Sequence, residues 1–197
     1  MNVAVRYYSR GGNTKKLAEA IANAVGVEAE SVERPLDEKT DVVFLGSAVY
    51  ANGVDEAVKR FLRKNQSQIG VIYNFSTAAI APSTYPQIKK LAKELEIPIA
   101  DQEYHCRGSF LLLNRGRPNE SDLLRASSFA KLAVQREGKA GARMADALDT
   151  LEKAADKAAE ALKDTAENAA DAAGAVLEKV ADAVADMADA GSSEKAE

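Results

Sequence analysis

A loop near the start of the chain contains the residue types that bind phosphate groups. It follows a short apolar run and consists of Ser9, Arg10, Gly11, Gly12, Asn13 and Thr14. The hydroxyl and amide side chains can donate hydrogen bonds, and the glycines allow backbone N–H groups to turn toward one anion. Asn13 or Thr14 would cap a following helix, whose N-terminus carries a partial positive charge. The loop therefore predicts a phosphate site, and the alternative is a tight turn with an ordinary helix cap.

The segments around this loop alternate between strand and helix patterns. Apolar, β-prone runs predict strands, and apolar residues at helical spacing predict helices. The predicted strands are 3–8, 27–32, 41–48, 69–76 and 103–112, and the predicted helices are 14–25, 54–63, 84–95 and 121–136. This alternation indicates right-handed crossovers and a doubly wound α/β domain with a five-stranded parallel sheet over residues 1–137. Ligands of such sheets bind at the carboxyl ends of the strands, where the loop lies.

The rest of the chain differs in composition and charge. Residues 1–143 carry a net charge of +5 and residues 144–197 carry −9, so the total of −4 hides two opposite parts. Residues 138–143 (GKAGAR) are predicted to form a linker. Residues 144–190 repeat apolar positions, mostly alanine, every 11 residues, which predicts an Ala-rich acidic amphipathic helix. The alternative is a disordered or only partly helical tail, because alanine buries little apolar area. Residues 191–197 are expected to be a disordered end.

Composition excludes several other functions. One cysteine and one histidine argue against an internal disulfide framework and most zinc sites, so no metal is expected. The loop matches neither GxxxxGK[ST] nor GxGxxG. Basic clusters on the helices lack interleaved aromatic residues, which argues against nucleic-acid binding. No apolar run approaches the roughly 20 residues that span a bilayer, and no secretion signal is seen, so a cytoplasmic location is expected.

Three residues on the predicted strands have their own expectations. His105 and Cys106 are adjacent, so they should point to opposite faces of the sheet and cannot form a catalytic pair. Cys106 is expected in the core. Arg6 lies in the predicted central strand, where it is either buried beside a carboxylate or directed to solvent at the strand end. No catalytic residue is assigned.

The loop resembles the FMN (flavin mononucleotide) phosphate loop of flavodoxins, usually written T/S-x-T/S-G-N-T. Ser9, Gly12, Asn13 and Thr14 match this pattern, whereas Gly11 stands where a hydroxyl residue is usual. VVFLGSAVYANG is similar to the second flavin-contacting loop, and IYNFSTAA and EYHCRGSF resemble the ends of the fourth and fifth strands. The resemblance covers residues 1–137 and implies the strand order 2-1-3-4-5.

The resemblance also implies a set of residues that contact FMN. The second loop would contribute Ser47, Ala48, Val49, Tyr50, Ala51, Asn52 and Gly53, and the third would contribute Ser76, Thr77, Ala78, Ala79 and Tyr85. Tyr50 would stack on the flavin ring or be a rim tyrosine, and Tyr85 would cover the outer flavin face or lie on the surface. The peptide that reorients with the flavin's redox state would lie at Ala51 or, after a one-residue shift, at Asn52-Gly53.

Three functions follow from these observations. The first is an FMN-binding electron carrier that acts between protein redox partners. The second is an FMN-dependent NAD(P)H:quinone reductase or oxidase of the same fold. The third is a protein that binds no flavin and interacts through its tail. The tail pattern resembles the 11-residue repeats of late-embryogenesis-abundant proteins, and the acidic tail is expected either to stay solvated or to dock on the basic core.

Overall fold

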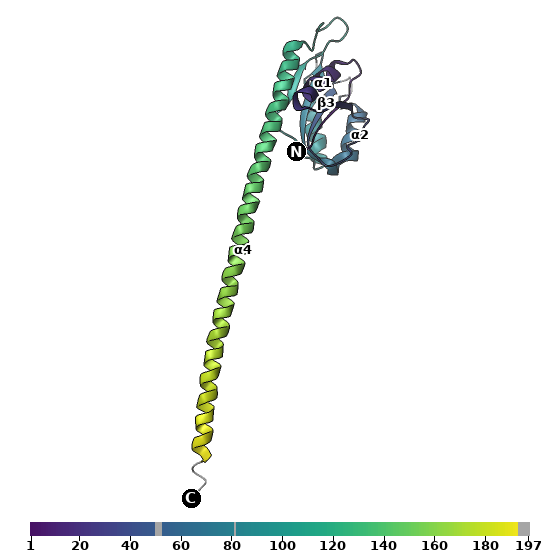
Figure 1. Ribbon diagram of the computed structural model, residues 1–197. Coiled ribbons are helices and arrows are strands. Elements are labelled where there is room, and N and C mark those ends of the chain that lie inside the picture. Colours follow the sequence, from purple (N-terminus) through teal and green to yellow (C-terminus); the bar gives the residue numbers. More distant parts are fainter. Residues whose placement is uncertain (50–52, 81, 193–197) are drawn as a thin grey trace. The chain divides into compact units, whose positions relative to one another are not determined.

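The computed structural model describes residues 1–49, 53–80 and 82–192. The chain divides into two compact units, Met1–Gly141 and Ala142–Glu197. The first unit contains one parallel sheet with the order β2-β1-β3-β4-β5, which confirms the predicted fold class (Figure 1). Its strands are β1 (Val3–Tyr7), β2 (Ala29–Ser31), β3 (Thr40–Ala48), β4 (Ile69–Ala78) and β5 (Tyr104–Arg107). The helices are α1 (Asn13–Val25), α2 (Glu56–Asn65), α3 (Tyr85–Glu94) and α4 (Glu120–Ser192), with a 3-10 turn at Gln66–Gln68.

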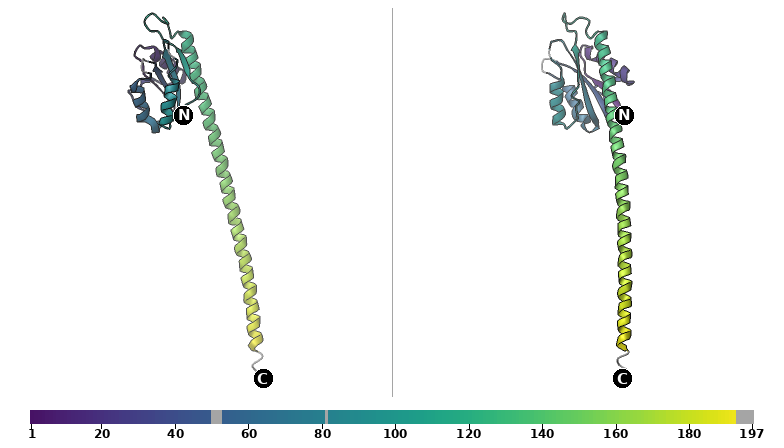
Figure 2. Two further views of the ribbon diagram at one scale, coloured as in Figure 1. Left: turned by 180° about the vertical axis from the view of Figure 1, so that it is seen from behind. Right: turned by 90° about the vertical axis from the view of Figure 1, so that its left-hand side faces the viewer.

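Helices cover both faces of the sheet (Figures 1 and 2). The central strand is β3 and not β1, where the prediction placed it, because two strands lie on each side of β3. β3 is buried on both sides, as its continuous apolar sequence predicts. On β3, Val43 and Leu45 pack in the cluster that includes residues of α2 and α3. Val42 and Phe44 pack in the opposite cluster, which includes residues of α1 and the first turns of α4. This alternation lets one strand anchor two layers of helices.

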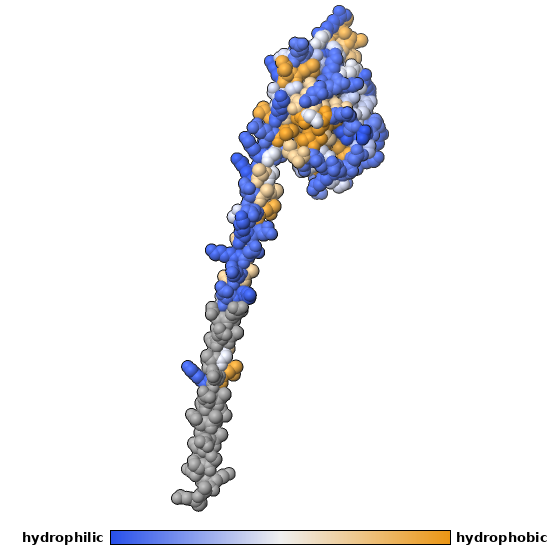
Figure 3. All heavy atoms as spheres, in the orientation of Figure 1, coloured by the Kyte–Doolittle hydropathy of each residue, from blue (hydrophilic) through white to orange (hydrophobic). Residues whose placement is uncertain are grey.

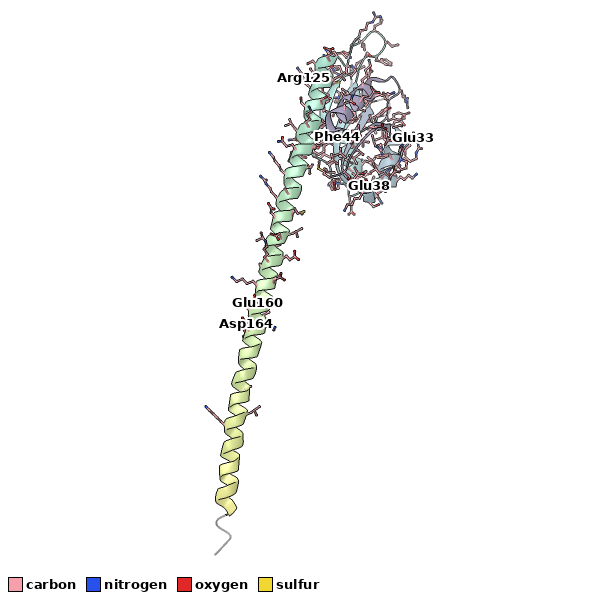
Figure 4. The ribbon with its side chains drawn as sticks, viewed as in Figure 1. Glu33, Glu38, Phe44, Arg125, Glu160 and Asp164 are labelled. Carbon is pink, nitrogen blue, oxygen red and sulfur yellow. The ribbon has the colours of Figure 1, made fainter. Side chains whose placement is uncertain are left out.

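Aromatic rings attach the start of α4 to the sheet. Phe129 of α4 lies about equally far from three rings of the sheet: its ring centroid is 6.1 Å from that of Phe44, 6.0 Å from Tyr73 and 6.1 Å from Tyr104. Figure 4 shows Phe44 beside this part of α4. The Tyr73 hydroxyl also donates to Glu137 Oε1 at 2.6 Å. These contacts are all made within the first unit.

Arg6 forms a buried ion pair, which is the first of its two predicted alternatives. The residue is 5% exposed, and its Nη1 lies 2.8 Å from Glu30 Oε2 on the neighbouring strand β2. Arg6 and Glu30 are register partners in the β1–β2 ladder, so the pairing of the strands sets the pairing of the charges. Burial lowers the pKa of Arg6, and Glu30 opposes that change. Arg6 also donates three further hydrogen bonds, to the carbonyls of Val5, Arg34 and Pro35.

The predicted fifth strand is wrong in its C-terminal half. The sequence predicts a strand over 103–112, but β5 ends at Arg107. Residues 108–117 instead form a loop in which Leu111 and Asn114 have positive φ angles of 52° and 51°. The apolar run at 110–113 has the composition of a strand. However, among the described residues β4 is the only strand beside β5, and it ends at Ala78, the register partner of Arg107, so this run lies beyond its partner strand.

The predicted linker is part of a helix. Residues 138–143 are helical and belong to α4. Lys, Ala and Arg at these positions are strong helix formers, and each of the two glycines weakens a helix by only about 1 kcal/mol. The boundary between the two compact units nevertheless falls at Gly141.

The second unit is helical in its described part. From Ala142 to Ser192 the chain continues α4, which includes the predicted Ala-rich segment 144–190. Of the predicted end 191–197, residues 193–197 lie outside the described residues. Acidic side chains such as Glu160 and Asp164 project from this helix (Figure 4). In the part of the chain that the structure describes, no helix is long and apolar enough to cross a membrane.

Gly46 gives the first testable prediction, because the Phe75 ring packs directly over it. A Cβ at Gly46 would lie 2.2 Å from Phe75 Cζ, and Phe75 is fully buried. We expect Gly46→Ala to lower the free energy of unfolding in urea by about 2 kcal/mol or more, through overpacking. The matched variant Gly138→Ala, with open space in α4, should instead raise it by roughly 0.5–1 kcal/mol. Equal effects of the two variants would contradict this packing.

Candidate phosphate and flavin site

The start of α1 is an uncapped helix N-terminus. Gly12 is the N-cap residue of the helix and has a φ of +81°. It makes no side-chain capping hydrogen bond. The first turn contains no acidic residue, whereas Lys15 and Lys16 are exposed there. The first backbone N–H groups of a helix have no partner within the helix. Combined with the helix dipole, they form a site for an anion rather than for a cation.

Thr14 connects the first predicted loop to the third. Thr14 and Thr77 are both buried, and their Oγ1 atoms lie 2.9 Å apart in a hydrogen bond. Thr14 is in the first turn of α1, and Thr77 is near the carboxyl end of β4. The structure therefore brings together two segments that are 63 residues apart and that the sequence predicts separately as ligand contacts.

Asn13 connects the first loop to the segment after β5. Its Nδ2 donates to the Ser109 carbonyl at 2.8 Å, and its Oδ1 accepts from the Ser109 hydroxyl at 3.1 Å. A Cβ at Gly108 would lie 3.0 Å from Asn13 Nδ2, so a glycine allows this close approach. Sequence reasoning missed Ser109, although EYHCRGSF contains it.

Arg10 connects the first loop to the start of α2. Its guanidinium lies 6.0 Å from the Tyr8 ring centroid and 2.5 Å from Asp55 Oδ2. Asp55 also caps α2 by accepting from the Ala57 backbone N–H at 3.0 Å. The Ala57 N–H and Arg10 hold the pKa of Asp55 below its usual value. Tyr8 and Asp55 were missed; an aspartate directly before a helix is the signal that could have identified Asp55.

The second loop is described at its two ends. Ser47 is 1% exposed, and its hydroxyl has no hydrogen-bond partner in the described part of the chain. Ala48 ends β3 and Val49 follows it. Tyr50, Ala51 and Asn52 lie outside the described residues, so the predictions for the stacking tyrosine and the reorienting peptide concern residues not described. Gly53 has a φ of +92°, which favours glycine.

The third predicted loop begins inside β4. The sequence ends the strand at 76, but β4 continues to Ala78, so Ser76, Thr77 and Ala78 pair with β5. The Ala78 carbonyl accepts from the Gly108 N–H at 3.0 Å, and the Ala79 carbonyl accepts from Asn114 Nδ2 at 2.8 Å. The carbonyls of Ala78 and Ala79, two of the predicted flavin-contacting residues, therefore accept hydrogen bonds from the segment after β5.

Ser76 and His105 form a polar contact on the opposite face of the sheet from Thr77. Ser76 Oγ lies 2.9 Å from His105 Nδ1 and also accepts from the Thr84 N–H at 3.4 Å, just before α3. Burial lowers the pKa of His105, which favours the neutral form of its ring. Cys106 packs in the second core cluster, and burial raises the pKa of its thiol to about 12. These positions agree with the predicted opposite orientation of the two residues.

Tyr85 contacts residues away from the first loop. Its hydroxyl donates to the Ala100 carbonyl at 2.9 Å, and Lys89 Nζ lies 5.4 Å from its ring centroid. The Ala100 N–H donates to the carbonyl of Ile72, which lies in the first half of β4. These contacts favour the surface alternative for Tyr85. In the described residues no cluster of three or more His, Cys, Asp or Glu side chains could hold a metal ion.

The predicted basic clusters lie on the surface of α2 and α3, and several of their members form local ion pairs. Lys59 and Arg63 pair with Glu56 at 3.3 and 2.9 Å. Lys89 pairs with Asp101 at 3.1 Å. These pairs reduce the positive field that the net charge alone suggests for this part of the chain.

Comparisons with known proteins agree with the fold of the first unit. The model of the flavodoxin domain family matches residues 4–98. An uncharacterized protein of Methanocaldococcus jannaschii is 28% identical over 137 residues, covering 60% of this chain and 88% of the relative. A flavodoxin from the domain Archaea superposes with a TM-score of 0.54 at 19% identity, covering 66% of this chain and 94% of that one. Oxidised flavodoxin 1 from Bacillus cereus superposes with a TM-score of 0.55 at 15% identity, covering 68% and 98%. The chain contains a flavodoxin-like domain.

The Thr14–Thr77 hydrogen bond gives the second prediction. Thr14→Val or Thr77→Val alone leaves one buried hydroxyl unsatisfied, so each should lower the free energy of unfolding by about 1–2 kcal/mol. The double variant removes both hydroxyls and should be about 1 kcal/mol more stable than the sum of the single effects predicts. Urea unfolding of the four proteins measures this coupling. Strictly additive effects would mean that the two loops do not meet through these side chains.

Proposed function

We propose that this protein binds FMN non-covalently, with the phosphate at the N-terminus of α1, and carries electrons between protein redox partners. The flavin, when bound, supplies the electron-transfer chemistry, and the chain binds it, orients it and sets its surroundings. The flavodoxin-like domain supports the class of cofactor.

The observation that carries the proposal is the uncapped start of α1. Left-handed Gly12 turns the chain into the helix and has no side chain to cap it, so among the described residues the first N–H groups have no side-chain cap from this position. Space is open around Gly11, where a Cβ would meet nothing within 4 Å. A phosphate brings negative charge to a place where the dipole, the free N–H groups and the exposed Lys15 and Lys16 all favour it. The residues present therefore fit the phosphate of FMN.

A second feature fits the rest of the cofactor. The Ser47 hydroxyl is buried at the carboxyl end of β3 and has no partner among the described residues. Buried hydroxyl groups are nearly always hydrogen-bonded in folded proteins. We assign this hydroxyl as a donor or acceptor for a polar atom of the bound flavin. Ring stacking by Tyr50 remains a prediction, because that residue lies outside the described part.

The proposed role as an electron carrier is supported by how much of a flavodoxin the first unit matches. The superpositions cover 94% and 98% of two flavodoxins, so this unit matches nearly their whole length. Two residues suited to acid–base chemistry lie near the carboxyl ends of the strands, and both are already engaged. His105 bonds Ser76, and Cys106 is buried.

The reductase alternative is tested by turnover: a carrier should not sustain NADH or NADPH oxidation with a quinone, whereas a reductase would. Docking of the acidic tail on the basic core also remains a prediction, which a salt dependence of electron transfer would test.

Substitution of Gly11 gives the third prediction. Gly11 has open space and no positive φ, so a side chain fits there without strain. Gly11→Asp places a carboxylate beside the phosphate and should weaken FMN binding at least tenfold through like-charge repulsion. Gly11→Asn has nearly the same shape without the charge and should stay within about threefold of the native protein. Quenching of flavin fluorescence on binding gives both affinities.

The outcome that would contradict the phosphate site is equal FMN affinity for Gly11→Asp and Gly11→Asn. Unfolding curves of the two variants should coincide with that of the native protein, because neither residue contacts the core. A difference in affinity without a difference in stability therefore reports the charge alone.

A further inference from the structure

The loop between β5 and α4 exposes an unusual apolar tip. Phe110, Leu111, Leu112 and Leu113 are 60%, 83%, 75% and 46% exposed. Ile80, which is 76% exposed, lies close to this loop, because Arg107 donates to its carbonyl at 2.8 Å. Together these five residues are called the apolar tip. In Figure 1 the loop projects at the top of the first unit, and Figure 3 shows orange, apolar side chains beside blue ones there. Consecutive exposed apolar residues of this size indicate an interaction site.

The tip is held in its exposed conformation by the backbone. Phe110 and Leu113 exchange two hydrogen bonds, of 3.0 and 2.8 Å, which close a tight turn with Leu111 and Leu112 at its end. Leu111 has a φ of 52°, a conformation that leucine rarely adopts. Asn114 bonds the Ala79 carbonyl, and Ser109 bonds Asn13. The leucines are therefore presented to solvent by an anchored turn rather than by a frayed end.

The loop segment that contains the tip carries a positive net charge. Between Tyr104 and Asn119 the sequence contains three arginines, Arg107, Arg115 and Arg117, and no Asp or Glu. Arg107 and Arg115 are exposed, and Arg117 pairs with Asp122 at 2.9 Å. Apolar residues at the end of a turn, with guanidinium groups on both sides of them in the sequence, are arranged as in segments that enter the interface of an anionic bilayer.

We propose that the apolar tip inserts into the interface of an anionic lipid bilayer, with the neighbouring arginines at the level of the lipid phosphates. A bilayer fits better than a protein partner because Leu111 and Leu112 stand on a convex turn, which a fluid acyl layer can enclose without a matching pocket. The absence of carboxylates from 104 to 119 matches an anionic headgroup layer. The electrostatic attraction to anionic lipid is expected only at this loop, because the chain as a whole carries a negative net charge. The proposal is independent of FMN binding.

A tryptophan placed at the tip tests the proposal directly. The chain contains no tryptophan, so Leu112→Trp introduces a single fluorescent reporter. With vesicles of 70% phosphatidylcholine and 30% phosphatidylglycerol, we expect its emission to shift to shorter wavelength. The matched variant Leu132→Trp reports a comparably exposed position on α4, 65% against 75%, and should show no shift. Vesicles of phosphatidylcholine alone, or 0.5 M salt, should reduce the shift of Leu112→Trp.

Flotation of the full chain with the same vesicles supplies the second readout. Leu111→Ser with Leu112→Ser should lower the bound fraction at least tenfold, and Arg115→Glu should lower it severalfold. Leu124→Ser with Leu132→Ser, two exposed leucines of α4, should leave it unchanged. Because all these side chains are exposed, each variant should keep the native circular dichroism spectrum.

Three outcomes would overturn the proposal. If the native chain does not float with vesicles of either composition, the bilayer is not the occupant, and a protein partner is left for the tip. If it floats but the Leu111→Ser, Leu112→Ser variant floats equally, another part of the chain binds the lipid. A shift at Leu132→Trp equal to that at Leu112→Trp has the same meaning.

Discussion

Parallel pairing of β1, β3 and β4 is the constraint on which the rest of the structure depends. It places the carboxyl ends of these strands at one edge of the sheet, so the loops that follow them meet there. The crossover after β1 then requires α1 to begin at that same edge. The hydrogen bond between Thr14 and Thr77 is a direct consequence, because it joins the first turn of α1 to the end of β4.

The segment after β5 completes this edge. It bonds Asn13 through Ser109, and it bonds the Ala78 and Ala79 carbonyls through Gly108 and Asn114. One loop therefore fixes both the start of α1 and the end of β4, while its own apolar tip remains exposed. The proposed cofactor site and the proposed membrane contact thus share one scaffold but use different residues.

The sequence was sufficient for the parts of the fold that repeat a physical pattern. The buried run at 41–48 and the helical spacing of Leu17 and Ile21 predict β3 and α1, and both are observed. The ends of strands were harder to predict from the sequence. Residues 110–113 are as apolar as a strand but lie beyond the end of the edge strand β5. The helical 138–143 shows that two glycines do not interrupt a helix whose other residues favour it.

The site was predictable where one loop contains all its chemistry and not where distant residues combine. Ser9 to Thr14 are adjacent in sequence, so residue types alone were enough to predict a phosphate loop there. The bonds of Arg10 to Asp55 and of Asn13 to Ser109 span 45 and 96 residues, and no local pattern encodes them. Tyr85 was ambiguous because its orientation depends on the Ala100 carbonyl, which only the packing of α3 brings near.

The central claim is that the N-terminus of α1 binds the phosphate of a flavin. The most direct measurement compares FMN with riboflavin, which has the same ring system and no phosphate, in titrations of the full-length native protein followed by flavin fluorescence. If the helix start holds the phosphate, FMN should bind at least one hundredfold more tightly than riboflavin, and high salt should narrow the difference. Equal affinities for the two flavins, or no binding of either, would contradict the account.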